Sequence, residues 1–354
     1  MDFRSDNTGA AAPEIIESIH SANLESCSPY GDDDYTKKLQ KRFAEIFETD
    51  VTVLTAITGT AANAIALSAL TPPYGVIYCH SQSHIATDEC GSPELMSGGA
   101  KLVTVGGRQA KISLGKLEHA VEHSGSGFVH CAQPAVVSIT QSTEMGAVYS
   151  LDELAAINDI TTKNNLKIHM DGARFANALV SLGATPADMT WRSGVDILSF
   201  GATKNGACLA EAIVLFRKDL AEDLAFRHKR AGQLVSKGRF IATQLLAYTT
   251  DDLWLNMASK ANRFASNLAS RLAELDGAEL ESTNACNEVF VTLPKPVIDG
   301  LRIAGAQFYG WPEPWDSSRT IRLVTRWDTK ESEIDEFIFE VSRLLVQNRK
   351  DIPV

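Results

Sequence analysis

Short apolar runs alternate with stretches of helical periodicity through the first two thirds of the chain. Each run has the length of a buried strand, and the stretches between them repeat apolar residues every three or four positions. Such alternation predicts a mostly parallel α/β sheet. We expect seven strands, at residues 51–57, 75–79, 101–105, 135–140, 167–170, 195–200 and 212–216, and helices at 64–70, 116–123, 151–165 and 175–182.

Beyond residue 216 the pattern changes to longer helices followed by shorter strands, which suits a smaller α+β lobe. A chain of 354 residues also exceeds what one simple core usually serves. We therefore expect a large domain over residues 1–248, whose polar N-terminal arm is either a loose terminus or a segment laid over a site. A small domain is expected over residues 249–354. Just before this domain we expect helices at 219–230 and 240–248. Within it we expect helices at 252–275 and 331–347 and strands at 289–293 and 320–325.

Composition and charge exclude several classes of protein. Contents of 44% hydrophobic and 22% charged residues are ordinary for a globular protein. The net charge of −11 argues against sequence-independent binding to nucleic acid, which relies on basic side chains. The first residues, M-D-F-R-S-D-N, carry charges where a signal peptide needs an apolar run, and no run approaches the length of a membrane span. We expect a cytoplasmic protein without a nucleic-acid or membrane partner.

The pattern of cysteines also favours a cytoplasmic protein. None forms a C-x-x-C pair, and no cluster of histidine and cysteine has the spacing of a zinc site. Scattered thiols without a framework fit a reducing compartment. We therefore expect no metal site. The six cysteines are Cys27, Cys79, Cys90, Cys131, Cys208 and Cys286.

Polar side chains follow the expected strand ends. Because ligands of a parallel α/β sheet sit beyond the carboxyl ends of its strands, we expect these side chains at one edge. The stretch T58-G-T-A-A-N63 joins a strand to a helix through a glycine turn, where free N–H groups favour an anion such as phosphate. Any strand-to-helix turn has this form, so the signal alone is weak. The other strand-end residues are His84, Gln141, Asp171, Arg174 and Lys204.

Lys204 follows a buried apolar strand, where an ammonium group is costly to desolvate. Burial lowers the pKa of a lysine and leaves a neutral amine that can act as a nucleophile. Taken alone, the stretch fits an inert loop lysine better. Asp171, at another strand end, changes the balance, because pyridoxal phosphate needs an acid for its ring nitrogen and an amine for a Schiff base. Gly59 and Thr60 would then hold the phosphate, and His84 would stack on the ring.

Three features of the sequence have ordinary explanations as well as functional ones. The acids of Y30-G-D-D33 precede a helical pattern and could simply favour a helix N-terminus. His84 could be a polar surface residue of a loop. The basic stretch 227–239 is normally a solvated helix face, although it could face a phosphate or an oligomer partner.

Taken together, the motifs resemble those of the low-specificity L-threonine aldolases. These enzymes belong to the β-eliminating lyase group and have the aspartate aminotransferase fold, fold type I; the most similar branch includes the phenylserine aldolases. The motifs occur in the family's order along essentially the whole chain. They are R4-S-D-N7, Y30-G-D-D33, T58-G-T-A-A-N63, S83-H-I-A-T-D-E-C-G91, H169-M-D-G-A-R174, F200-G-A-T-K-N-G206 and I321-R-L-V-T325.

The resemblance implies a pyridoxal phosphate enzyme with a mostly parallel seven-stranded sheet and a small C-terminal α+β domain. The implied reaction is retro-aldol cleavage of L-threonine, L-allo-threonine and related β-hydroxy-α-amino acids to glycine and an aldehyde, acetaldehyde in the case of threonine. Active sites of the family are shared between subunits, so a homodimer or homotetramer is implied. Rival interpretations are β-elimination or transamination on the same fold, and a relative that has no enzymatic activity.

The resemblance also implies roles by position. Lys204 matches the Schiff-base lysine, and Asp171 matches the partner of the ring nitrogen. Gly59 and Thr60 match phosphate-binding positions. His84 matches the histidine stacked on the cofactor, which is also a candidate base for the substrate β-hydroxyl. The groups that bind the substrate carboxylate are matched by Ser5, Arg174 and Arg322, and arginine suits this role because it pairs with a carboxylate through two hydrogen bonds. The loop at the edge of the active site is matched by Tyr30 and Asp33.

The sequence departs from the family at two places. Some members have a histidine in the loop that here contains Glu144, which puts a second catalytic histidine in doubt. Many members place an arginine from a neighbouring subunit on the cofactor phosphate. This chain offers Ser236 and Lys237 there, and Lys237 could serve as a point charge.

Overall fold

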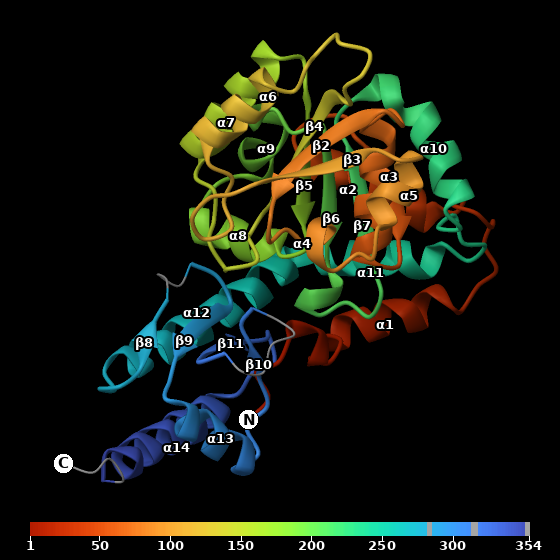
Figure 1. The fold of residues 1–354 in the computed structure, drawn as a ribbon. Coiled ribbons are helices and arrows are strands. Elements are labelled where there is room, and N and C mark those ends of the chain that lie inside the picture. The colour runs from red at the N-terminus through yellow and green to blue at the C-terminus, as the bar shows by residue number, and fades with distance from the viewer. Residues whose placement is uncertain (282–284, 313–317, 351–354) are drawn as a thin grey trace.

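Two β-sheets and the helices packed on them make up the fold (Figure 1). The structure is a computed structural model that describes residues 1–281, 285–312 and 318–350, so the end of the expected small domain, 351–354, lies outside the described residues. The large sheet has seven strands in the order β1-β7-β6-β5-β4-β2-β3. They are β1 (Thr52–Ala56), β2 (Gly75–His80), β3 (Lys101–Val105), β4 (Gln133–Thr140), β5 (Lys167–Gly172), β6 (Ile197–Gly201) and β7 (Glu211–Leu215).

Six strands of the large sheet run in one direction, and β7 runs against its neighbours β1 and β6. The prediction of a mostly parallel seven-stranded sheet is therefore confirmed. Each expected strand overlaps an observed strand, and their ends differ by at most two residues. Because β1, β2, β4, β5 and β6 all end at the same edge, the polar residues that follow them gather there.

The large sheet is buried on both faces. On β6, Ile197 packs into one core cluster and Leu198 into another on the opposite face. This two-sided burial is why the strands form continuous apolar runs in the sequence. The first face is covered by α3 (Gly59–Leu70), α5 (Ser92–Ser97) and α10 (Ala221–Arg230), and the second by α1 (Pro13–Ala22), α2 (Asp34–Ile46), α6 (Leu114–Glu122), α7 (Leu151–Lys163), α8 (Phe175–Leu182) and α11 (Arg239–Thr249).

Local signals explain where some helices begin. The Thr58 hydroxyl accepts a hydrogen bond from the N–H of Ala61 (3.1 Å) and caps α3, which therefore starts earlier than the predicted residue 64. The short helices α4 (His84–Thr87) and α9 (Pro186–Met189) were not predicted, because four residues are too few to show a period. Within the described ranges, no helix combines the length and apolarity that crossing a membrane requires.

The small lobe is built on a four-stranded antiparallel sheet in the order β10-β11-β9-β8, which confirms the expected C-terminal α+β unit. Side chains of α12 pack into the core of this lobe. The same helix extends out of the lobe and packs against α8 beside the large sheet (Figure 1). The elements are α12 (Leu253–Ala273), β8 (Glu279–Leu280), β9 (Glu288–Thr292), α13 (Lys295–Ile303), β10 (Tyr309–Gly310), β11 (Thr320–Val324) and α14 (Glu331–Lys350).

The N-terminal arm is anchored in the small lobe and then reaches the large sheet. Phe3 is fully buried in the core of the small lobe. Its N–H donates to the carbonyl of Gln307 (2.8 Å), and its carbonyl accepts from the N–H of Val324 (2.9 Å). The next residues form a short 3-10 helix, η1 (Asp6–Thr8), at the carboxyl edge of the large sheet. Of the two alternatives for the arm, the segment laid over a site is the one observed.

Two glycines allow the ends of β5 and β6 to approach closely. A Cβ added to Gly201 would lie 2.5 Å from the carbonyl oxygen of Ala173, and one added to Gly172 would lie 2.8 Å from the carbonyl oxygen of Ser199. Real Cβ atoms do not come this close to backbone atoms. Asp171 and Lys204 flank the two glycines in sequence, so the approach of the strands determines how far apart these two side chains lie.

Replacing Gly201 with alanine should lower the free energy of unfolding by about 1–3 kcal/mol, because the new methyl group overpacks against fixed backbone. Urea denaturation measures the change. The matched control is Gly115→Ala in α6, where a Cβ would meet no atom within 4 Å and the value should stay the same or rise by up to about 1 kcal/mol. Equal midpoints for Gly201→Ala and the wild type would contradict the prediction.

Candidate active site

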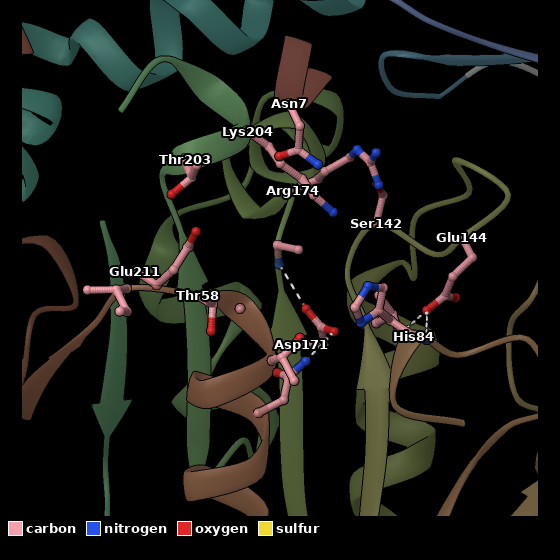
Figure 2. A pocket seen from close by; sticks show the side chains of 16 residues that line it. Asn7, Thr58, His84, Ser142, Glu144, Asp171, Arg174, Thr203, Lys204 and Glu211 are labelled. Atoms are coloured by element: carbon pink, nitrogen blue, oxygen red, sulfur yellow. Dashed lines mark hydrogen bonds between the residues drawn. The ribbon is translucent and has the colours of Figure 1, made fainter. Parts of the chain in front are cut away.

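A cavity of about 290 Å³ opens at the carboxyl edge of the large sheet (Figure 2). The ends of β5 and β6, the start of α3, the loop after β4 and the arm all contribute to its walls. Six of the predicted site residues line it together, and polar residues without a predicted role join them. The former are Gly59, Thr60, His84, Asp171, Arg174 and Lys204; the latter include Asn7, Asn63, Glu144, Thr203 and Glu211.

Lys204 lies in a short 3-10 turn, η3 (Thr203–Asn205), directly after β6. The turn is held by Asn205, whose side-chain amide donates to the hydroxyl of Tyr248 (2.7 Å) and to the carbonyl of Trp254 (2.9 Å). Gly206 follows with a φ of 103°, a conformation that favours glycine. These contacts fix the backbone on both sides of Lys204, which is half-buried at the cavity wall.

A chain of hydrogen bonds connects Asp171 to His84. The side-chain amide of Asn63 donates to Asp171 Oδ2 (2.8 Å) and to Glu89 Oε1 (2.8 Å). Glu89 Oε1 in turn lies 2.8 Å from Nδ1 of the His84 ring. Asn63, Glu89 and Asp171 are all buried, so each carboxylate depends on these donors for its stability.

The two members of the His84–Glu89 pair influence each other's pKa. Burial raises the pKa of the Glu89 carboxyl, and the hydrogen bond from His84 only partly offsets it. The same hydrogen bond raises the pKa of His84 against the opposing effect of burial. The His84 ring is therefore held in one orientation and favours its protonated form.

The start of α3 contains the two residues for which the sequence predicts phosphate binding. Gly59 and Thr60 lie in its first turn, where backbone N–H groups have no partner within a helix. A Cβ added to Gly59 would meet no atom within 4 Å, so there is open space beside this turn. With the helix dipole, these N–H groups favour a phosphate.

Arg174 is held by carboxylates on one side of its guanidinium. Its Nε donates to Asp6 Oδ2 (2.7 Å) and its Nη2 to Asp6 Oδ1 (3.1 Å), while Glu288 Oε1 lies 3.5 Å from Nη2. Burial by itself would raise the pKa of Asp6, but the charges of Arg174 and Lys204 outweigh it and lower that pKa. The arm thus places a buried carboxylate against the arginine that the sequence assigned to the substrate.

Five residues that the sequence assigned to the site lie outside the cavity wall. One of them, Asp33, caps α2 by accepting a hydrogen bond from the N–H of Thr36 (2.9 Å), as its ordinary explanation predicted. Ser5 and Arg322 border the arm: Ser5 caps η1, and Arg322 donates to the carbonyl of Arg4 (3.5 Å). Tyr30 and Lys237 are exposed on another part of the surface, where the N–H of Tyr30 donates to the carbonyl of Ser236 (2.9 Å). A single chain leaves Tyr30, Asp33 and Lys237 away from its own cavity, whereas Ser5 and Arg322 lie at the arm that contributes Asn7 to the cavity wall.

Several residues of the site were missed from the sequence. Asn63 and Glu89 lay inside motifs that had been noted, but nothing in the sequence indicated that they would meet. Asp6 likewise belonged to a noted motif without a role. Glu211, at the start of β7, had no signal of its own, because a glutamate before an apolar run is ordinary.

Comparison with known proteins gives a consistent picture. The family model described as β-eliminating lyase matches residues 2–295. The chain is 40% identical over 346 residues to a low specificity L-threonine aldolase of a Pseudomonas species, covering 98% of both chains. It is also 40% identical to the enzyme of that name from Pseudomonas aeruginosa, covering 96% of this chain and 97% of the relative. Among solved structures, Leishmania major threonine aldolase matches with a TM-score of 0.90 and 28% identity, over 97% of this chain and 99% of that one.

The bridging role of Asn63 leads to a stability prediction. Asn63→Ala leaves two buried carboxylates without their shared donor and should lower the free energy of unfolding by about 2–3 kcal/mol. Ser68→Ala is the matched control on the same helix, because Ser68 is also buried but its hydroxyl bonds only the nearby carbonyl of Ile65. Urea denaturation compares the variants, and equal losses for both would contradict the role given to Asn63.

Glu211 leads to a prediction about pH. Burial raises the pKa of its carboxyl to about 7, whereas the unfolded carboxyl titrates near 4.5. Between these values the folded chain retains a proton that the unfolded chain loses, so this group lowers stability as pH rises from 4.5 to 7. Glu211→Gln keeps the acceptor for the N–H of Ala202 and removes the titration. The variant should gain about 2–3 kcal/mol relative to the wild type at pH 8 and nothing at pH 4.

Urea denaturation of both proteins across this pH range provides the measurement. A constant difference between wild type and Glu211→Gln would mean that folding does not raise the pKa of the Glu211 carboxyl, and would contradict the prediction.

Proposed function

The chain belongs to the β-eliminating lyase family, and we propose that it cleaves L-threonine, L-allo-threonine and related β-hydroxy-α-amino acids to glycine and an aldehyde. With threonine the aldehyde is acetaldehyde. The observation that carries the proposal is that Lys204, Asp171 and Arg174 line the same cavity in a member of this family. Like its family, the enzyme depends on pyridoxal phosphate.

The residues of the cavity fit this cofactor. Lys204 offers an amine, Asp171 a buried carboxylate for the ring nitrogen, and the turn at Gly59 and Thr60 free N–H groups with open space for a phosphate. His84 supplies a flat ring held in one orientation by Glu89. These residues therefore match the aldehyde, the ring nitrogen, the ring face and the phosphate of the cofactor. When bound, the cofactor holds the substrate amine covalently and withdraws electrons from the substrate Cα, so that the Cα–Cβ bond can break.

The chain's own residues bind and orient the substrate. Asp6 occupies Nε and Nη2 of Arg174, and within the described part of the chain no hydrogen bond is made by Nη1. Nη1 is therefore the donor that we assign to the substrate carboxylate, with Ser5 and Arg322 assisting from the arm and the small lobe. Fixing the carboxylate turns the Cα–Cβ bond toward the wall formed by His84 and Glu144. A base on this wall takes the proton of the β-hydroxyl, and His84 is the candidate that the sequence indicated.

We further propose a cytoplasmic homodimer or homotetramer whose subunits complete one another's sites. Tyr30 and Lys237 support this assembly, because both are exposed and their loops are hydrogen-bonded to each other. From that surface, Lys237 would reach the cofactor phosphate of a neighbouring subunit, and Tyr30 the edge of its cavity. All six cysteines lie in the described residues and are free, which is compatible with a reducing compartment.

Lys204→Ala should abolish the visible absorbance of the bound cofactor and reduce glycine release from threonine by more than about 10³-fold, because the nucleophile is lost. Spectroscopy and an assay for glycine and acetaldehyde provide the two measurements. The exposed residue Lys101 gives the matched control, since Lys101→Ala should leave both unchanged.

A panel of L and D isomers and both β-epimers would define the substrate range of the wild type. A keto acid from threonine in place of acetaldehyde and glycine would contradict the proposed reaction and favour transamination. Near wild-type cleavage by Lys204→Ala would contradict the lysine assignment alone.

A further inference from the structure

Glu144 is a titratable side chain in a loop whose neighbouring residues Gln141, Ser142 and Thr143 are buried. The loop follows β4 and is itself held firmly, because the hydroxyl of Thr143 donates to the carbonyl of Gln109 (2.8 Å). Glu144 lines the same cavity as Lys204 and Asp171. Figure 2 shows its carboxylate next to His84, on the side of the cavity opposite Thr58 and Glu211.

The two oxygens of this carboxylate differ. Oε1 accepts hydrogen bonds from the backbone N–H of His84 (2.8 Å) and from the hydroxyl of Thr140 (2.8 Å). Oε2 is shielded from solvent and has no hydrogen-bond partner in the described part of the chain. Leaving a carboxylate oxygen without a donor is costly, and an amide would serve as well for the bonds to Oε1. The residue type therefore indicates a use for the second oxygen.

Burial and a neighbouring charge make Glu144 a stronger base than an ordinary carboxylate. Burial, assisted by the nearby Asp171 carboxylate and opposed by the hydrogen bonds to Oε1, raises the pKa of Glu144 to about 7. Two other titratable groups face it, the Cys79 thiol and the Tyr149 hydroxyl, and burial raises the pKa of each well above neutrality, so that they carry no charge. A base with a pKa near the working pH transfers protons most effectively.

His84 is less suited to the same task. Its Nδ1 lies 2.8 Å from Glu89 Oε1 and is therefore not available to a substrate hydroxyl, and the same hydrogen bond raises the pKa of the ring. Its ring faces the cavity between Asp171 and Glu144 (Figure 2). A flat ring in this place is suited to contact a planar cofactor, while the carboxylate behind it is suited to accept a proton.

Resting on the proposed function, we propose that Glu144 is the catalytic base that takes the proton from the substrate β-hydroxyl. A small rotation about the broad terminal torsion of the glutamate turns Oε2 to the substrate without moving the loop. As the O–H bond breaks, its electron pair becomes the second C–O bond of the aldehyde, and the Cα–Cβ pair remains on Cα. Cα then gains a proton, so one proton leaves oxygen, one joins carbon, and no oxidant or reductant is consumed.

Glu144→Gln tests the assignment, because glutamine retains the acceptor Oε1 and loses the base. The variant should release glycine from β-hydroxy amino acids with a kcat lowered by about 10²-fold or more, with little change in KM. Exchange of the Cα protons of glycine with deuterated water, followed by NMR, needs Lys204 but no β-hydroxyl, and should persist at the wild-type rate. Thr140→Val, which removes one donor to Oε1, should cause a smaller loss of kcat.

The pH dependence provides a second readout. In the wild type, kcat should rise to a plateau above about pH 7 as Glu144 loses its proton, and Glu144→Gln should lack this rise. Glu144→Asp should retain the rise at a lower rate, which keeps the test informative if the amide variant folds poorly. An infrared carboxyl band that titrates near pH 7 in the wild type and is missing in Glu144→Gln would identify the group without any turnover.

Wild-type kcat in Glu144→Gln, or an equal loss of cleavage and of glycine exchange, would overturn the assignment of Glu144 while leaving the proposed function intact. A wild-type enzyme that releases no glycine from any β-hydroxy amino acid would instead overturn the proposed function, and the assignment with it.

Discussion

One amide group holds together the part of the molecule on which the site depends. The side chain of Asn63 donates to both Asp171 and Glu89, two buried carboxylates that would otherwise repel each other. Asn63 is on α3, Asp171 ends β5 and Glu89 follows α4, so three separate segments meet at one nitrogen. Through Glu89 the same contact sets the orientation of the His84 ring. The position of α3, and with it the turn at Gly59, is thus coupled to the Asp171 carboxylate in the cavity wall.

The large sheet and part of the site were predictable because both follow from a simple periodic rule. Apolar runs reveal strands, and parallel strands end at one edge, so Lys204, Asp171, His84 and the turn at Gly59 could be placed together before any contact was known. The contacts of Asn63 and Glu89 could not be predicted, since they arise from tertiary packing. The pairing of Asp6 with Arg174 spans 168 positions of sequence, and no local pattern encodes it.

Electrostatics explains why an acidic chain can handle an anionic cofactor and substrate. The cavity contains several buried carboxyls, and burial raises the pKa of Glu144 and Glu211 to about 7 in both cases. A carboxyl with a raised pKa is partly protonated near neutral pH, so these two groups carry less negative charge than the sequence suggests. Positive charge is concentrated instead at Lys204 and Arg174, and the helix start at Gly59 adds a favourable dipole. The cavity therefore offers cationic groups to an anionic ligand although the chain as a whole has a net charge of −11.

The route of the N-terminal arm has a practical consequence for anyone who alters the chain. Phe3 is a core side chain of the small lobe, the carbonyl of Met1 accepts from the N–H of Gln307, and Asp6 is the partner of Arg174. The N-terminus is therefore poorly suited to truncation. Deletion of the first six residues would leave a cavity in the core of the small lobe and would leave the buried Arg174 without its carboxylate partner Asp6. Affinity tags placed ahead of Met1 therefore need a flexible spacer, because the arm connects the core of the small lobe to the arginine at the cavity wall.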